Sequence, residues 1–124
     1  SEETVKNGQH FVHQEGKTVF KYAVSNMADV SEKMLTRNHL TKEDIQWLVP
    51  HQANKRIIEA TANRVGVEAD KVMVNIHKYG NTSAASVPLA LDEAIKEGKL
   101  KPGDLFITVA FGGGFSYGGA LIEL

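Results

Sequence analysis

The chain has 124 residues, 42% of them hydrophobic and 23% charged, which is enough for one packed domain and excludes a disordered chain. The formal net charge of −1 argues against nucleic acid or an acidic membrane surface as a partner, and the lack of cysteine excludes disulfides, thiolate metal sites and a cysteine nucleophile. No apolar run is long enough to span a membrane, and no basic segment with a cleavage site indicates secretion, so we expect a cytoplasmic location. The opening SEETVKNG lacks methionine, and we expect the sequence to be part of a longer protein.

The first predicted elements are a weak strand and a long helix. Residues 10–14 (HFVHQ) are the strand candidate. Apolar residues recur at helical spacing from 18 to 34, which predicts an amphipathic helix. Thr41, followed by two acidic residues, indicates the N-cap of a short helical turn. The apolar run 45–49 then predicts a strand that stops at Pro50.

The middle of the chain alternates in the same way. Helical spacing returns from 52 to 65, and Gly66 is placed to end that helix. Residues 72–76 form a short β-branched run and predict another strand. The segment 82–98 (TSAASVPLALDEAIKEG) predicts a helix. No residue from 79 to 91 is charged, so we expect its first half to be buried on all sides.

Two strands complete the predicted order. DLFITVAF (104–111) is nearly continuous in apolar residues, as expected in a sheet that is covered on both faces. GGG (112–114) turns the chain, and FSYGGALIEL (115–124) returns as a final strand. The order β-α-β-α-β-α-β-β predicts a layered α/β unit with a mixed sheet.

His51 is the first candidate for chemistry. It lies where a predicted strand ends and a helix begins, the usual place for ligand-facing residues in open α/β sheets. The positive end of the helix dipole would lower the pKa of the imidazole and favour a neutral ring that donates one hydrogen bond at pH 7. A single histidine at such a position is more often structural, and both interpretations stay open.

Asn81 is the second candidate. It follows a glycine and opens the uncharged helix, where asparagine is usually a cap or a turn residue. The small residues that follow it (Ser83, Ala84, Ala85 and Ser86) allow close packing. We therefore expect Asn81 to lie inside the molecule and not at its rim.

The glycine-rich stretch AFGGGFSYGG (110–119) is the third candidate. It is not a phosphate loop, because no GK[ST] follows. It is either a tight β-turn with aromatic neighbours or a segment that brings bare backbone N–H groups against a substrate, as in an oxyanion hole.

The remaining histidines do not indicate a metal site. His10 and His13 would point to opposite faces of a strand, and His39 and His77 lack acidic or thiolate partners at ligand spacing. Arg56 and Arg64 share one face of the predicted helix, which is either a solvated face or a surface for an acidic partner.

Three motifs together resemble one enzyme family. PHQAN (50–54), GNTSAAS followed by VP (80–88) and FGGGFSYGG (111–119), in this order, resemble the C-terminal half of the β-ketoacyl-acyl-carrier-protein synthase III family. The resemblance covers essentially the whole chain and implies that residues 1–124 are the C-terminal domain. It implies the C-terminal half of a thiolase-like fold, with a mixed sheet of the five-stranded type between covering helices.

The resemblance also implies a chemistry. Members of the family are acyltransferases that perform decarboxylative Claisen condensation of an acyl-CoA primer with malonyl-acyl-carrier protein. This reaction initiates type II fatty acid synthesis. Its active site uses a Cys, a His and an Asn. The His and Asn match His51 and Asn81, which would both donate hydrogen bonds to the malonyl thioester carbonyl, and the Cys would lie in an N-terminal half that this chain lacks. Gly113 would supply an oxyanion-hole N–H, and no cofactor is implied beyond the coenzyme A and phosphopantetheine thioesters.

Partners and binding segments follow from the same resemblance. The implied partners are the N-terminal half, a second copy in a homodimer, acyl carrier protein and acyl-CoA. The pantetheine arm would lie beside Asn54, Ile57 and Phe111. The implied carrier-protein-binding residues are Gln52, Ala53, Asn54, Lys55 and Arg56, with Lys21 and Arg64.

Two alternatives remain. One is a related Cys-His-Asn condensing enzyme of secondary metabolism, and the other is a non-catalytic module that binds carrier protein, against which the retention of both His51 and Asn81 argues. Without a thiol, the chain alone should be inactive. Without the other half, it should expose a large apolar surface.

Overall fold

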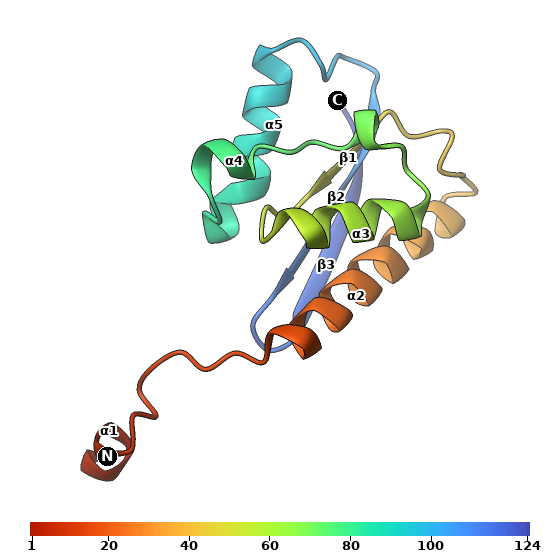
Figure 1. Cartoon of the computed structure of the whole chain (residues 1–124). Coiled ribbons are helices and arrows are strands. Elements are labelled where there is room, and N and C mark those ends of the chain that lie inside the picture. The colour runs from red at the N-terminus through yellow and green to blue at the C-terminus, as the bar shows by residue number, and fades with distance from the viewer.

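The computed structural model describes residues 1–124 and shows a mixed sheet with helices on both faces (Figure 1). Its three strands lie in the order β1 (Trp47–Pro50), β2 (Leu105–Gly112) and β3 (Ser116–Glu123). β1 runs parallel to β2, and β3 runs antiparallel to it. The α/β class and the mixed sheet are as predicted, with fewer strands.

Two predicted strands did not form as expected. Residues 10–14 are irregular, and Val12 in this segment is 94% exposed. The run 72–76 contributes only one bridge, between Leu48 and Val72. After Thr41 only a single turn forms, in which the Asp44 N–H donates to the Thr41 carbonyl oxygen at 3.2 Å, and no helix follows it. There the Asp44 carboxylate closes a turn by accepting the Thr41 backbone N–H at 2.7 Å, and this bond lowers the pKa of Asp44.

Two helices cover one face of the sheet. They are α2 (Gly16–Arg37) and α3 (Lys55–Val65), and Figure 1 shows them side by side. The larger core cluster lies between them and the strands, and includes Met27, Leu48 and Ile107, each no more than 1% exposed. This face is closed by the chain itself.

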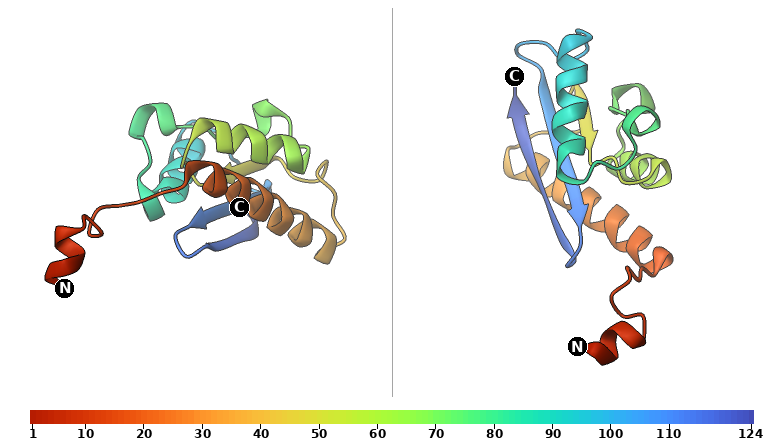
Figure 2. Two further views of the ribbon diagram at one scale, coloured as in Figure 1. Left: turned by 60° about the horizontal axis from the view of Figure 1, so that its bottom comes forward. Right: turned by 90° about the vertical axis from the view of Figure 1, so that its left-hand side faces the viewer.

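The other face carries one helix, α5 (Ser86–Lys96). Ala90 and Ala94 pack there against Phe106 and neighbouring apolar residues. Figure 2 shows that β3 extends beyond the cover of this helix. The far side of α5 is also open. In the predicted first half, Ala84, Ala85 and Pro88 are exposed, and near the end of the helix Ile95 is 48% exposed. Within this chain, the helix is therefore not buried on all sides, contrary to the prediction.

Local sequence signals set the ends of the helices. Asn54 caps α3, because its Oδ1 accepts the Arg56 N–H at 2.9 Å, so the helix begins later than the predicted residue 52. Gly66 ends α3 in the left-handed conformation, with φ of 81°. A 3₁₀ turn (Ser83–Ala85) precedes α5, and Pro88 falls in its first turn, where proline is tolerated.

One glycine sets the distance between α2 and the β2–β3 hairpin. A Cβ at Gly119 would lie 2.6 Å from the Thr108 carbonyl oxygen and 2.7 Å from the Met34 Cε. Only glycine allows the helix to pack this closely on the strand.

The remaining helical elements are short: α1 (Glu2–Lys6), a 3₁₀ turn (Ala69–Lys71) and α4 (Ile76–Tyr79). The segment that contains α1 projects from the body of the molecule (Figure 1). None of the helices combines the length and the hydropathy that crossing a membrane would require.

Candidate functional site

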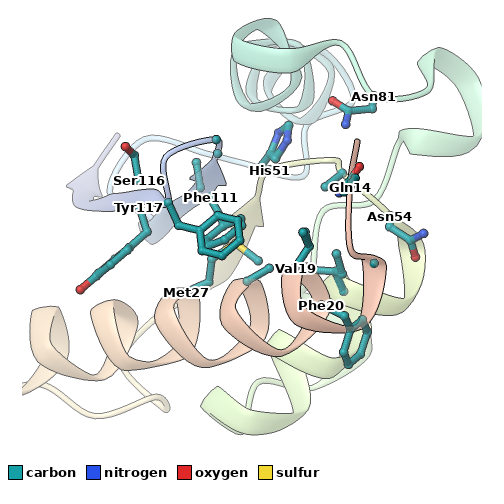
Figure 3. Close-up of a pocket in the computed structure, with 18 of the residues that line it drawn as sticks. Gln14, Val19, Phe20, Met27, His51, Asn54, Asn81, Phe111, Ser116 and Tyr117 are labelled. Carbon is teal, nitrogen blue, oxygen red and sulfur yellow. The ribbon is translucent and has the colours of Figure 1, made fainter. Parts of the chain in front are cut away.

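One large pocket brings the three sequence motifs together. It has a volume of about 1480 Å³ and is bounded by the start of α2, the β1–α3 connection, the loop before α5 and the β2–β3 turn. His51, Asn81, Phe111 and Gly113 all line it. Figure 3 shows the side chains of His51 and Asn81 near each other on one side of this pocket.

His51 directly follows β1 and continues its pairing, because its backbone N–H donates to the Val109 carbonyl oxygen at 2.7 Å. The side chain is half-buried, and its Nδ1 lies 2.5 Å from the Ser86 Oγ. Burial lowers the pKa of the imidazole and favours the neutral ring. The sequence predicted a lowered pKa from the dipole of the helix that follows His51. The cause in the structure is burial, and the helix whose first residue contacts the ring is α5, through Ser86.

Asn81 is held by a turn of its own loop. Its Oδ1 accepts the Ser83 backbone N–H at 3.0 Å, as expected of a turn residue. Because the amide oxygen is engaged, the Nδ2 group is the end that can donate to a ligand. Asn81 is exposed in this chain, so the expected position inside the molecule is wrong for these residues alone.

The glycine turn forms another wall of the pocket. Gly113 lies just beyond β2, and its backbone N–H makes no hydrogen bond within the chain. Aromatic rings surround the turn: Phe115 lies 5.0 Å from Phe111 and 5.4 Å from Tyr22, centroid to centroid. Tyr117 points away from His51 and Asn81 (Figure 3).

Gln52 does not lie on a docking surface, as the sequence predicted, but is buried. The side chain is 1% exposed and uses both ends of its amide. Its Nε2 donates to the carbonyl oxygens of Pro50 and Met73, and its Oε1 accepts the N–H groups of Asn75 and Ile76. Gln52 thus joins the end of β1 to residues 73–76 and is not available to a protein partner.

The predicted basic residues separate into two groups. Arg56 lines the pocket, with its guanidinium carbon 5.8 Å from the centroid of the Phe20 ring. Arg64 instead bonds to Asp29 at 2.9 Å and joins α3 to α2. Lys21 is exposed but does not line the pocket, and Lys55 faces Glu59 at 3.7 Å.

Three further residues of the predicted binding segments also lie at the pocket. Ala53, Asn54 and Ile57 line it beside Arg56. The sequence interpretation missed Lys17, a lining residue at the start of α2 that no motif signals. It also missed the contact between Ser86 and His51, because Ser86 was interpreted only as a small packing residue. Nowhere in the structure do three His, Asp or Glu side chains gather as metal ligands would.

Comparison with known sequences gives consistent results. Residues 35–124 match the family described as 3-oxoacyl-[acyl-carrier-protein (ACP)] synthase III C terminal. The chain is 53% identical over 123 residues to a β-ketoacyl-[acyl-carrier-protein] synthase III of Chlorobaculum tepidum, covering 99% of this chain and 37% of that protein. It is 56% identical over 120 residues to synthase III 2 of Bacteroides thetaiotaomicron, covering 97% of this chain and 35% of that protein.

Solved structures are similar in the same way. The 3-oxoacyl-[acyl-carrier-protein] synthase III of Aquifex aeolicus superposes with a TM-score of 0.89 at 46% identity, covering 92% of this chain and 37% of that one. The Thermus thermophilus synthase III gives 0.87 at 43% identity, with coverage of 90% and 35%. A priming β-ketosynthase of the R1128 polyketide pathway gives 0.82 at 38% identity, with coverage of 90% and 34%. The chain thus spans little more than a third of the length of these relatives.

Proposed function

Because this chain belongs to the family of 3-oxoacyl-[acyl-carrier-protein] synthase III C-terminal domains, we propose that it is the C-terminal half of an acyltransferase. In the complete protein, this enzyme condenses an acyl-CoA primer with malonyl-acyl-carrier protein and initiates type II fatty acid synthesis. The observation that carries the proposal is the position of His51 and Asn81 in one pocket, each with a side-chain nitrogen left to a ligand.

His51 and Asn81 act in the decarboxylation step. The Nε2 of His51 and the Nδ2 of Asn81 donate hydrogen bonds to the thioester carbonyl oxygen of the malonyl group. When the bond between the α-carbon and the carboxylate breaks, CO₂ leaves and its bonding electrons form an enolate whose charge lies on that oxygen. Two donors already in place stabilise this charge more than the neutral carbonyl, which lowers the barrier.

The condensation step uses a nucleophile outside this chain. The chain has no cysteine, so the thiol that carries the acyl primer belongs to the preceding half. The enolate carbon attacks the acyl carbonyl, a carbon–carbon bond forms, and the cysteine sulfur leaves. The free N–H of Gly113 is suited to hold the oxyanion of this step, together with a second N–H beside the cysteine.

The mouth of the pocket accepts the carrier and its pantetheine arm. Arg56 and Lys17 place positive charge there, which suits the acidic surface of a carrier protein or the phosphates of coenzyme A. The arm passes Asn54, Ile57 and Phe111 on its way to His51.

The N-terminal half covers the open face beside α5. Ile95 and the outer strand β3 expose apolar surface there. In the proposed assembly, a helix of the other half packs against α5 between two sheets, and the complete protein forms a homodimer in the cytoplasm. The 124-residue chain expressed alone should self-associate or bind a hydrophobic dye. A stable monomer that binds no dye would contradict this part of the proposal.

A second candidate is a priming enzyme of secondary metabolism, which the similarity to the R1128 polyketide enzyme favours. It uses the same two donors. Turnover with a polyketide carrier protein but not with a fatty acid carrier protein would select this candidate.

The proposal is tested by decarboxylation of malonyl-carrier protein in the complete protein. His51→Ala and Asn81→Ala should each lower the rate about a hundredfold to a thousandfold, while acylation of the cysteine persists. His77→Ala and Asn63→Ala are matched controls, because both residues are exposed and neither lines the pocket. If either pocket variant decarboxylates at the wild-type rate, its role as a donor is wrong.

A matched pair of arginine variants tests carrier binding. Arg56→Glu should raise the KM for malonyl-carrier protein and reduce its dependence on salt. Arg64→Glu changes the same charge on the same helix, but at a residue that is paired with Asp29 and lies outside the pocket. If the two variants raised the KM for malonyl-carrier protein equally, carrier binding would depend on the net charge of the chain and not on Arg56.

A further inference from the structure

Ser86 contacts His51 from outside the pocket. It is the first residue of α5, its side chain is 1% exposed, and it does not line the pocket. Its Oγ meets the Nδ1 of His51, whereas the Nε2 of the ring has no hydrogen-bond partner within the chain. Ser86 therefore contacts the nitrogen that cannot face a substrate.

The single proton of the Ser86 hydroxyl has two possible acceptors. One is the Ser83 carbonyl oxygen at 2.9 Å, and the other is the Nδ1 of His51 at 2.5 Å. The backbone N–H of Gln52 approaches the same oxygen at 3.3 Å and can only donate. The direction of the contact between Ser86 and His51 therefore depends on where the hydroxyl proton points.

The Ser83 carbonyl oxygen does not need the Ser86 hydroxyl as its hydrogen-bond donor. It already accepts the backbone N–H of Ser86, which closes the 3₁₀ turn before α5. The Nδ1 of His51 has no other partner in the chain. A hydroxyl that points to Nδ1 therefore leaves both acceptors with a hydrogen bond. In the other arrangement the hydroxyl donates to the Ser83 carbonyl, and Nδ1 must itself carry a proton and donate to the Ser86 Oγ.

We propose that the Ser86 hydroxyl donates to Nδ1 and holds the neutral His51 ring in the tautomer that carries its proton on Nε2. This inference rests on the proposed function, which requires a donor at Nε2. In the other tautomer, Nε2 would present a lone pair to the thioester oxygen and repel it. Ser86 is a positioning residue, because it acts through His51 and touches no reacting atom.

The test reads the tautomer directly. In the complete protein labelled with ¹⁵N-histidine, the His51 spectrum should show a protonated Nε2 and an unprotonated Nδ1. In Ser86→Ala, the two ring nitrogen signals should move toward each other as the tautomers mix. The decarboxylation rate should fall about five- to tenfold, as expected for one lost hydrogen bond, and KM should change little.

Two further variants separate this role from packing. Ser86→Thr keeps the hydroxyl and should restore both the spectrum and the rate. Ser31→Ala is the matched control, because Ser31 is also fully buried and donates to a backbone carbonyl, that of Met27, at 2.9 Å. It should leave the His51 signals unchanged.

The inference is overturned if wild-type His51 carries its proton on Nδ1, or if Ser86→Ala keeps both the wild-type signals and the wild-type rate. The wild-type spectrum shows which nitrogen of His51 carries the proton, even if Ser86→Thr does not fold. If His51→Ala stops decarboxylation while Ser86→Ala changes nothing, only the role of Ser86 falls. If His51→Ala has no effect, the proposed function itself falls.

Discussion

The two faces of the sheet are covered by helices to different degrees. On the face under α2 and α3, large apolar residues such as Met27 and Ile107 are fully buried. On the face under α5, the core cluster is smaller, and β3 lies open beyond the helix. The fold of this chain therefore rests on the first face, whereas the second is a surface suited to packing against another part of the protein.

The largest expected effect compares two isoleucines of the hairpin. Ile107 lies in the closed core and is fully buried, and Ile107→Ala should cost about 2–5 kcal/mol of unfolding free energy. Ile122 pairs with Phe106 on the open face and is 37% exposed, so Ile122→Ala should cost clearly less in this chain. Denaturant unfolding of both variants measures the difference.

The same two variants should behave differently in the complete protein. If the N-terminal half covers the open face, the cost of Ile122→Ala should rise there, while that of Ile107→Ala stays the same. A cost for Ile122→Ala that is equally small in both proteins would show that nothing packs on this face.

A smaller effect separates two neighbouring glycines of β3. Gly119→Ala places a methyl group against the Thr108 carbonyl and α2, and should cost about 1–3 kcal/mol. Gly118 faces the opposite side and has no atom within 4 Å of an added Cβ. Gly118→Ala should therefore leave the melting temperature of this chain nearly unchanged, and an equal loss in both variants would contradict the close packing of α2.

The smallest effect concerns pH. Burial lowers the pKa of His51 in the folded state, so the unfolded chain takes up a proton first, near its ordinary pKa of about 6.5. The stability that the neutral ring contributes is fully present above that pH, and it is lost as the pH falls from there through the lower pKa of the folded state. Unfolding between pH 7.5 and 5 should thus depend less on pH in His51→Gln than in the wild type, and an equal dependence in the two proteins would contradict this role of His51.

The sequence predicted the parts of the fold that depend on local pattern. The spacing from 18 to 34 corresponds to α2, and the apolar run 104–111 corresponds to β2. Taken singly, the signals at His51, Asn81 and the glycine motif left both interpretations open. The family resemblance that they carry together implied one site, and all three line the pocket.

Two of the failures have a common physical cause, which is that side-chain hydrogen bonds replaced expected backbone patterns. Residues 73–76 did not form a strand, and the Gln52 amide holds their backbone instead. Asn54 capped α3 and moved its start away from His51. The Gln52 bonds join residues that are 21 to 24 positions apart, which no local pattern signals, whereas the Asn54 cap is a local bond that the helical spacing obscured.

The most direct test of the central claim is a crystal structure of the complete protein with a non-hydrolysable malonyl-thioester analogue. The thioester carbonyl oxygen should lie within about 2.7–3.2 Å of both the His51 Nε2 and the Asn81 Nδ2. An oxygen that is bound by neither nitrogen, in an otherwise ordered analogue, would contradict it.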